Sequence, residues 1–481
     1  MVNLLDDSEI TGNLSDFQVS SLDGHLKRGF ANELPPELLV YIFEIAQNML
    51  LPSERLFRHF PLVLGDVSHY WRQVAFGAPT LWSNVDISHP RDITVLRTYL
   101  DRSKDYPIDL HLTYDIAHAQ DKKADPSEVD QLIGILQPHY FHCRSIRINS
   151  GPYRQATPEM VSLIESMRDG YYPMLQSFLF QGAETYDTME SCAILNNAPN
   201  LTNVRLGGLG LSYCRPPLNT VTELHLAFPT VIPYPDFSKM LRSCKSLITL
   251  CIYDDLVLPW PFGQHLIHIP SLRYLRIFGN MMDGRVSKFL LSISAPDMDE
   301  LTIAPIATGD LTILQEDIIS HKTPRFPALK SLTLAPADAD AMKLTLGPAS
   351  ICFPGIELLI LPNYYSKYFL SSFMVETSDG AAPLWPGLHT LAVRDIDGRY
   401  NQRVLYEFVE ERQRLGVPLN ALYLDSASVT RMTRMDWLKD QLSVVEVDPW
   451  RIQCEDAFFT IDELGRFLEL VGDNYISGWS P

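Results

Sequence analysis

The feature that most constrains this chain is a short apolar pattern that recurs along most of its length. The pattern is a pair of apolar residues separated by one residue, as in a β-strand with one face turned to a core. Successive pairs lie 20 to 32 residues apart. The first members of the pairs are Ile146, Phe178, Val204, Leu224, Leu250, Leu275, Leu301, Leu332, Leu359, Leu391 and Leu422. A repeat of this length, with one short strand in each unit, is typical of a solenoid.

The segments between these strands support the same interpretation. Helical patterns occur over residues 236–244, 284–293 and 401–415. Prolines stand shortly before several strands, where a residue that cannot donate to a strand ladder is tolerated. The full leucine-rich-repeat signature, which ends on an asparagine, occurs cleanly only at 272–280. We therefore expect an irregular leucine-rich-repeat-like α/β solenoid, with a parallel sheet and helices outside it.

Charge and composition limit the kinds of partner. The chain has 39 Lys and Arg against 58 Asp and Glu, a formal net charge of −19. This deficit disfavours binding to nucleic acid through phosphate neutralisation, and it disfavours docking on anionic lipid. Seven scattered cysteines without a Cys-x-x-Cys pair, and an N-terminus without a signal sequence, favour the cytoplasm or the nucleus. We expect neither nucleic acid nor a membrane as a partner.

The region before the solenoid has a helical pattern. Leu38, Leu39, Ile42 and Phe43 follow helical spacing behind two prolines, which the first turn of a helix tolerates. Further helices are predicted over 53–60 and 62–76, the latter ending before the Gly77-Ala78-Pro79 breaker. This makes a small three-helix head.

The residues of this head resemble an F-box. The run Glu33-Leu34-Pro35-Pro36-Glu37-Leu38, then Ile42-Phe43, then Trp71-Arg72-Gln73-Val74-Ala75 resembles the family motif. The sequels Ala78-Pro79-Thr80-Leu81-Trp82-Ser83 and Tyr106-Pro107-Ile108-Asp109-Leu110 are similar to those of F-box proteins abundant in mushroom-forming fungi. The resemblance covers about residues 31–112.

The resemblance implies an adaptor function. F-box domains bind the Skp-type adaptor, or linker, of a cullin–RING ubiquitin ligase, while the rest of the chain holds a protein substrate. The linker-binding residues carried over from the family are Leu34, Pro35, Pro36, Leu38, Ile42 and Phe43. Val67 and Trp71 would lie nearer the core of the head.

Four segments follow from these patterns. We predict a flexible acidic tail over 1–30, an F-box-like helical domain over 31–90, a connecting helical and strand segment over 91–140, and the solenoid over 141–481.

The residues beside the apolar pairs point away from the core and form a candidate partner-binding surface on the concave face. Arg205, Tyr253, Tyr274, Arg276 and Phe278 fall on neighbouring units, and aromatic residues with arginine are typical of interface hot spots. The same aromatic residues also favour strands for packing reasons alone, so both interpretations stay open.

We expect no enzymatic activity, no cofactor and no metal site. The common hydrolase, phosphate-binding and zinc-protease motifs are missing from the sequence, and the His139/His142 and His265/His268 pairs lack a third ligand at a suitable spacing. The main alternative function is a leucine-rich-repeat protein-interaction scaffold unrelated to ubiquitin, whose F-box-like head is a structural cap. A hydrolase on an α/β array is a weaker third hypothesis.

Overall fold

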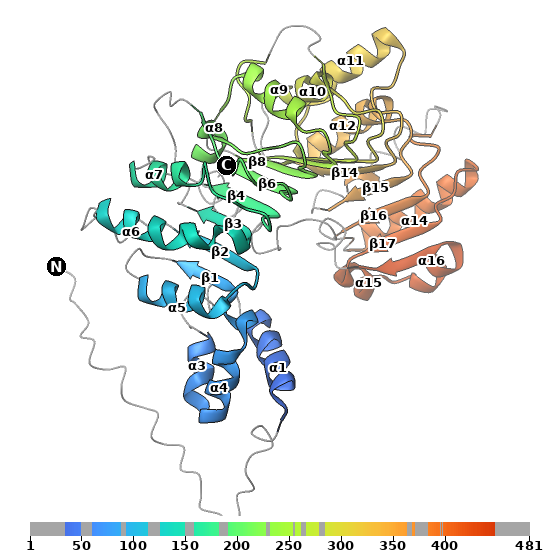
Figure 1. Ribbon diagram of the computed structural model, residues 1–481. Coiled ribbons are helices and arrows are strands. Elements are labelled where there is room, and N and C mark those ends of the chain that lie inside the picture. Colours follow the sequence, from blue (N-terminus) through green and yellow to red (C-terminus); the bar gives the residue numbers. More distant parts are fainter. Residues whose placement is uncertain are drawn as a thin grey trace, which may run out of the picture. The chain divides into compact units, whose positions relative to one another are not determined.

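The structure is a computed structural model of the 481-residue chain. It describes residues 34–49, 60–87, 93–113, 126–149, 158–181, 191–227, 231–253, 255–260, 266–278, 284–362, 368–370, 383–394, 396 and 398–447 (Figure 1). The chain divides into two compact units: a helical unit up to Trp82 with Arg102–Lys104, and a larger unit formed by the rest.

The helical unit contains α1 (Pro36–Met49), α3 (Phe60–Val67), α4 (His69–Gly77) and the 3₁₀ helix η2 (Pro79–Trp82). The single helix predicted over 62–76 is wrong, because two helices meet at Ser68. The Ser68 hydroxyl accepts a hydrogen bond from the backbone N–H of Trp71 at 3.1 Å and caps α4. Of the helix predicted over 53–60, residues 53–59 lie outside the described residues.

The larger unit is an α/β structure built on one parallel sheet of 14 strands. The strands are hydrogen-bonded to their neighbours in chain order, as in a solenoid. They are β1 (Asn84–Ile87), β2 (Ile108–Thr113), β3 (Cys143–Asn149), β4 (Ser177–Gln181), β6 (Asn203–Gly207), β8 (Glu223–Ala227), β9 (Thr249–Tyr253), β11 (Tyr274–Phe278), β13 (Glu300–Ile306), β14 (Ser331–Pro336), β15 (Leu358–Leu361), β16 (Thr390–Val393), β17 (Ala421–Leu424) and β18 (Ser443–Glu446).

The predicted apolar pairs set the register of this sheet. All eleven leading residues lie on strands, and each is the direct partner of the next, from Ile146 opposite Phe178 to Leu391 opposite Leu422. Every one of them is fully buried. The parallel sheet predicted from the periodicity is therefore confirmed.

Helices lie along one face of the sheet, on the outer side of its curve in Figure 1. They are α5 (Ile93–Ser103), α6 (Pro126–Leu136), η5 (Gln137–His142), α7 (Pro158–Ser166), α8 (Leu209–Tyr213), α9 (Tyr234–Ser243), α10 (Arg285–Ser292), α11 (Thr312–His321), α12 (Ala339–Cys352), α14 (Gly398–Arg414), α15 (Ser426–Arg431) and α16 (Met435–Gln441). Two short parallel ribbons join β5 (Cys192–Ala193) to β7 (Cys214–Arg215) and β10 (Ile267–His268) to β12 (Ile293–Ser294).

The sheet begins earlier than the boundary predicted at residue 141. β1 and β2 extend the same ladder, with Val85 opposite Leu110 and Leu110 opposite Ile146. Both strands fall in segments assigned from sequence to the head and the connecting region. The ladder itself shows that they belong to the sheet.

The prolines before the strands have a recurring geometry. At four repeats the residue before the proline accepts a backbone hydrogen bond from the residue three positions later, which closes a turn with proline at its second position. These bonds run from Leu201 to Ala198, Leu272 to Ile269, Leu329 to Phe326 and Leu388 to Trp385, at 3.0–3.4 Å. The turn leads directly into the strand.

The buried side chain of Arg412 in α14 connects several segments of the last repeats through hydrogen bonds. Its side chain is fully buried, and it donates hydrogen bonds to the carbonyl oxygens of Val417, Leu384, Trp385 and Leu388 at 2.8–3.3 Å. Burial lowers the pKa of Arg412 to about 10. We expect Arg412→Met to reduce the free energy of unfolding by about 3–5 kcal/mol, because it leaves buried carbonyls without donors.

Urea denaturation of the full chain measures this effect. The control is Arg403→Met on the same helix, whose side chain is exposed and should change stability by about 0.5 kcal/mol at most. Equal shifts for the two variants would contradict the role assigned to Arg412.

Candidate functional site

Helix α1 has two faces of opposite character. Leu39, Phe43 and Gln47 lie one turn apart and are buried. The opposite face carries five large apolar side chains that are between 43% and 78% exposed. These residues, which we call the α1 stripe, are Leu38, Tyr41, Ile42, Ile45 and Met49. Exposed apolar side chains grouped in this way make the α1 stripe a candidate interaction surface.

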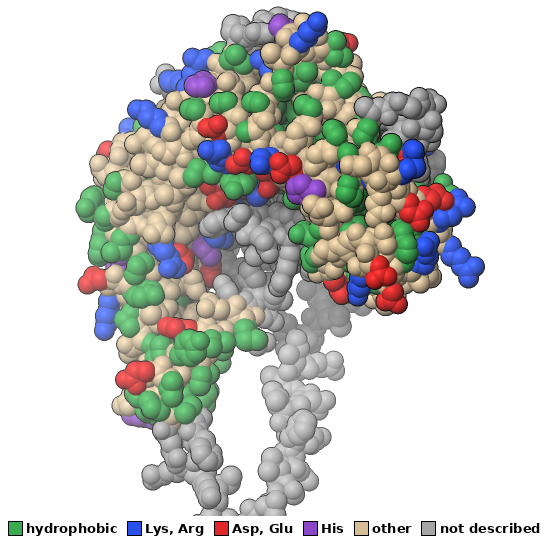
Figure 2. All heavy atoms as spheres, turned by 90° about the vertical axis from the view of Figure 1, so that its right-hand side faces the viewer, with side chains coloured by type: hydrophobic (Ala, Val, Ile, Leu, Met, Phe, Trp, Pro, Cys, Tyr) green, Lys and Arg blue, Asp and Glu red, His purple; other side chains and the backbone are tan. Residues whose placement is uncertain are grey.

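Helix α3 of the same unit adds two exposed side chains, Val63 and Val67. Figure 2 shows hydrophobic side chains gathered on this helical unit. The exposure of Val67 corrects the sequence analysis, which placed this residue near the core. On a helix as short as α3, the spacing of apolar residues does not show which face is buried. The sequence therefore could not determine the burial of Val67.

Side-chain contacts fix the orientation of α1. The rings of Phe43 and Trp71 pack with their centroids 4.9 Å apart. Gln47 Nε2 donates to the carbonyl of Leu81 at 3.2 Å, and the Tyr70 hydroxyl donates to the carbonyl of Leu34 at 2.6 Å. These contacts direct the stripe away from the core of the unit.

The six predicted linker-binding residues therefore divide into two groups. Pro35, Pro36, Leu38 and Ile42 are exposed, and Leu34 is half-buried. Phe43 is 2% exposed and packs in the core of the helical unit, so its side chain is not part of the exposed face.

The sheet carries a second candidate surface, on the side of the strands away from the leading residues. The predicted residues Arg205 and Arg276 lie in one registered row, which runs through His225 of β8 and Cys251 of β9. Tyr253 and Phe278 are direct partners in the next such row. The structure thus brings these predicted residues together on adjacent strands, and Tyr274 lies at the start of β11 beside them.

An aromatic stack crosses these strands. The rings of His225, Tyr253 and Phe278 follow one another with centroids 6.0 and 5.2 Å apart and nearly parallel planes. His225 Nδ1 lies 3.1 Å from the Tyr253 hydroxyl, and His225 Nε2 lies 2.5 Å from a carboxylate oxygen of Glu223. Sequence analysis did not single out Glu223 or His225. Both lie on β8, and His225 links Glu223 to Tyr253 of β9.

The residues of this sheet cluster are mostly buried. Tyr253 is 2% exposed, and Arg205 and Arg276 are also buried. Of the two interpretations left open from sequence, this burial favours packing for Arg205, Tyr253 and Arg276, while Tyr274 and Phe278 are half-buried. Arg276 Nη2 lies 3.5 Å from a Glu300 carboxylate oxygen, so charge is balanced within the cluster.

Burial determines the electrostatics of the cluster. It lowers the pKa of His225 to about 4, although the hydrogen bond with Glu223 acts in the opposite direction. Burial acts to raise the pKa of Glu223, but the His225 hydrogen bond and the charges of Arg205 and Arg276 outweigh it and lower this pKa. The imidazole is therefore neutral and the carboxylate is ionised at neutral pH.

Two further features bear on the predicted absences. His139 Nδ1 and His142 Nε2 lie 3.2 Å apart, and across the described ranges no group of three or more His, Cys, Asp or Glu side chains could hold a metal ion. The described cysteines, Cys143, Cys192, Cys214, Cys244, Cys251 and Cys352, are free and buried. None of the helices described is both long enough and apolar enough to cross a membrane.

Comparison with known proteins adds little. No family model and no curated protein matches the sequence. Among solved structures, a protein from Bacteroides fragilis is similar with a TM-score of 0.30 and 13% sequence identity, over 71% of this chain and 73% of that chain. A similarity this weak supports no statement about the fold or function of the chain.

The sheet cluster predicts acid sensitivity. His225 has an ordinary pKa of 6.5 when unfolded and about 4 when folded, so the unfolded state binds more protons between these values. The contribution of His225 to the free energy of unfolding is therefore fully present above pH 6.5. It falls by about 3 kcal/mol as the pH decreases to 4. The test is the urea midpoint of unfolding, measured at several pH values between 6.5 and 4. We expect this midpoint to depend less on pH in His225→Gln than in the wild type.

The matched control is His321→Gln, at an exposed position of α11, which should keep the wild-type slope. An unchanged pH dependence in His225→Gln would show that another group is responsible.

Proposed function

We propose that this protein is a substrate-recruiting F-box adaptor of a Skp/cullin/F-box-type ubiquitin ligase. The observation that carries the proposal is the α1 stripe, an exposed apolar helix face directly behind Pro35 and Pro36. The stripe includes Leu38 and Ile42, two positions of the motif by which the sequence resembles an F-box. In the proposed complex, the Skp-type linker would receive this helix in an apolar groove.

The size of the stripe is consistent with a protein contact. Fully burying a large apolar side chain gains about 1.5–3 kcal/mol, and roughly half of each stripe residue remains to be buried. The five residues together would gain about 4–8 kcal/mol, which is comparable with the lower part of the association cost of about 4–15 kcal/mol. Val63, Val67 and the proline segment would have to contribute the rest of the affinity.

The larger unit would hold the protein to be ubiquitinated. Its long registered sheet offers an extended surface, as solenoids do for protein partners, with Tyr274 and Phe278 at the half-buried edge of the sheet cluster. Such an adaptor performs no chemistry of its own. It would raise the local concentration of its substrate near a ubiquitin-charged enzyme, in the cytoplasm or nucleus.

The alternative is a scaffold unrelated to ubiquitin, in which the head is only a structural cap. The α1 stripe favours the adaptor, because a cap has no need of an apolar face that remains exposed. Both functions use the sheet as a protein-binding surface, so only the helical unit distinguishes them.

Substituting the stripe tests the proposal. We expect Leu38→Asp with Ile42→Asp to weaken binding of a Skp-type linker by at least about 1,000-fold, because two carboxylates would be buried in an apolar groove. The affinity is measured by titrating purified linker into the full chain. Thermal unfolding should stay close to wild type, because both side chains are exposed.

The control is Ile319→Asp, an equally exposed apolar residue on α11 of the larger unit, which should leave linker affinity unchanged. Failure of the wild-type chain to bind the linker, or equal binding by the double variant, would favour the scaffold.

A further inference from the structure

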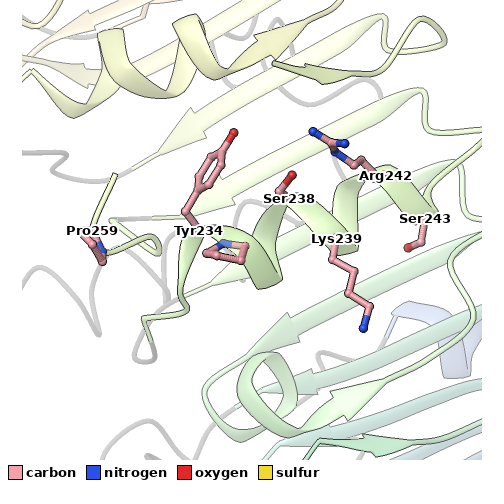
Figure 3. A pocket seen from close by; sticks show the side chains of 7 residues that line it. Tyr234, Ser238, Lys239, Arg242, Ser243 and Pro259 are labelled. Carbon is pink, nitrogen blue, oxygen red and sulfur yellow. The ribbon is translucent and has the colours of Figure 1, made fainter. Parts of the chain in front are cut away.

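An open cavity of about 860 Å³ lies beside helix α9 of the larger unit (Figure 3). Side chains of α9, from Tyr234 to Ser243, form most of its lining, and Pro259 contributes from the segment after β9. Trp260 packs against Tyr234, Phe237 and Phe289 with ring centroids about 6 Å apart, which holds this wall in place.

The charge of the cavity differs from that of the chain. Lys239 and Arg242 both line it, none of the described lining residues is acidic, and neither cation forms an ion pair within the described part of the chain. In a protein with a net charge of −19, the Arg242 guanidinium at this site favours an anion. The Lys239 side chain extends to the opposite side of α9 and adds a more distant positive charge (Figure 3). Arg242 Nη2 donates to the Leu266 carbonyl at 3.2 Å, which positions the guanidinium.

A serine hydroxyl on the same wall adds a hydrogen-bond donor. Ser238 is 8% exposed and lines the cavity, and its hydroxyl forms no hydrogen bond with any residue that the structure describes. Figure 3 shows this hydroxyl on the same side of α9 as the Tyr234 hydroxyl and the Arg242 guanidinium. These three residues are four positions apart, so they share one face of the helix. The serine oxygen reaches solvent, so its hydroxyl is available to donate a hydrogen bond to a ligand oxygen there.

The remaining walls are apolar. Pro235 and Pro259 present rings to the cavity, and the Tyr234 ring lies between α9 and Trp260. A bare anion would leave these surfaces unused. A ligand that carries a flat apolar group next to its charge would use both parts of the site.

We propose that this cavity binds a small aryl or alkyl phosphate ester. The phosphate would accept hydrogen bonds from Arg242 and Ser238, Lys239 would add a second positive charge, and the apolar group would lie against the two prolines. This binding site is independent of the proposed adaptor function.

Isothermal titration of the full chain with phenyl phosphate tests the proposal. Arg242→Gln should weaken binding by about tenfold or more, and Ser238→Ala and Lys239→Gln by about three- to tenfold, because each loses one charge-assisted contact or one charge. The control is Lys245→Gln, an exposed lysine just beyond α9 that does not line the cavity, which should change the affinity less than about twofold.

Two other ligands test the two halves of the site. Phenol should bind much more weakly than phenyl phosphate, and equal binding would refute the cation contribution. Inorganic phosphate should also bind more weakly, and equal binding would refute the apolar walls. Absence of binding at millimolar phenyl phosphate, or equal losses in Arg242→Gln and Lys245→Gln, would overturn the proposal.

Discussion

The packing of one apolar side chain per strand against the same position on the next strand is the interaction on which the larger unit depends. This stack runs without interruption from Val85 to Val444. A slip of one residue would turn a whole strand over and expose its apolar side chains, so the stack fixes the register. The register in turn places Arg205, His225 and Arg276 in one row, and the sheet cluster is a consequence of it.

Helix α1 of the helical unit also has one buried face and one exposed face, here with the period of a helix and not that of a strand. Phe43 and Gln47 tie one side of α1 to Trp71 and to the Leu81 carbonyl, and this leaves the stripe on the other side. Because α1 is held by both ring packing and a buried hydrogen bond, a partner would find the stripe already positioned. A preorganised surface loses less conformational entropy on binding, which favours affinity.

The sequence predicted the eleven strands and their register because side chains alternate with a period of two and the leading residues are strongly apolar. It missed β1, a strand of only four residues in which the polar Asn84 and Asp86 alternate with two apolar residues. The surrounding region is dominated by helical patterns. It could not separate Phe43 from Ile42, since both belong to a broad apolar stretch and only contact with Trp71 decides which is buried. The pairing of His225 with Tyr253 joins residues 28 positions apart and follows from strand contact, not from local sequence.

The most direct test of the proposed adaptor function is hydrogen–deuterium exchange of the full chain with and without a purified Skp-type linker. Docking of the stripe would stabilise α1, so amide exchange over residues 36–49 should slow markedly when the linker is added. Exchange in α11 of the larger unit should stay the same. Unchanged exchange over 36–49 at saturating linker would contradict the proposed function.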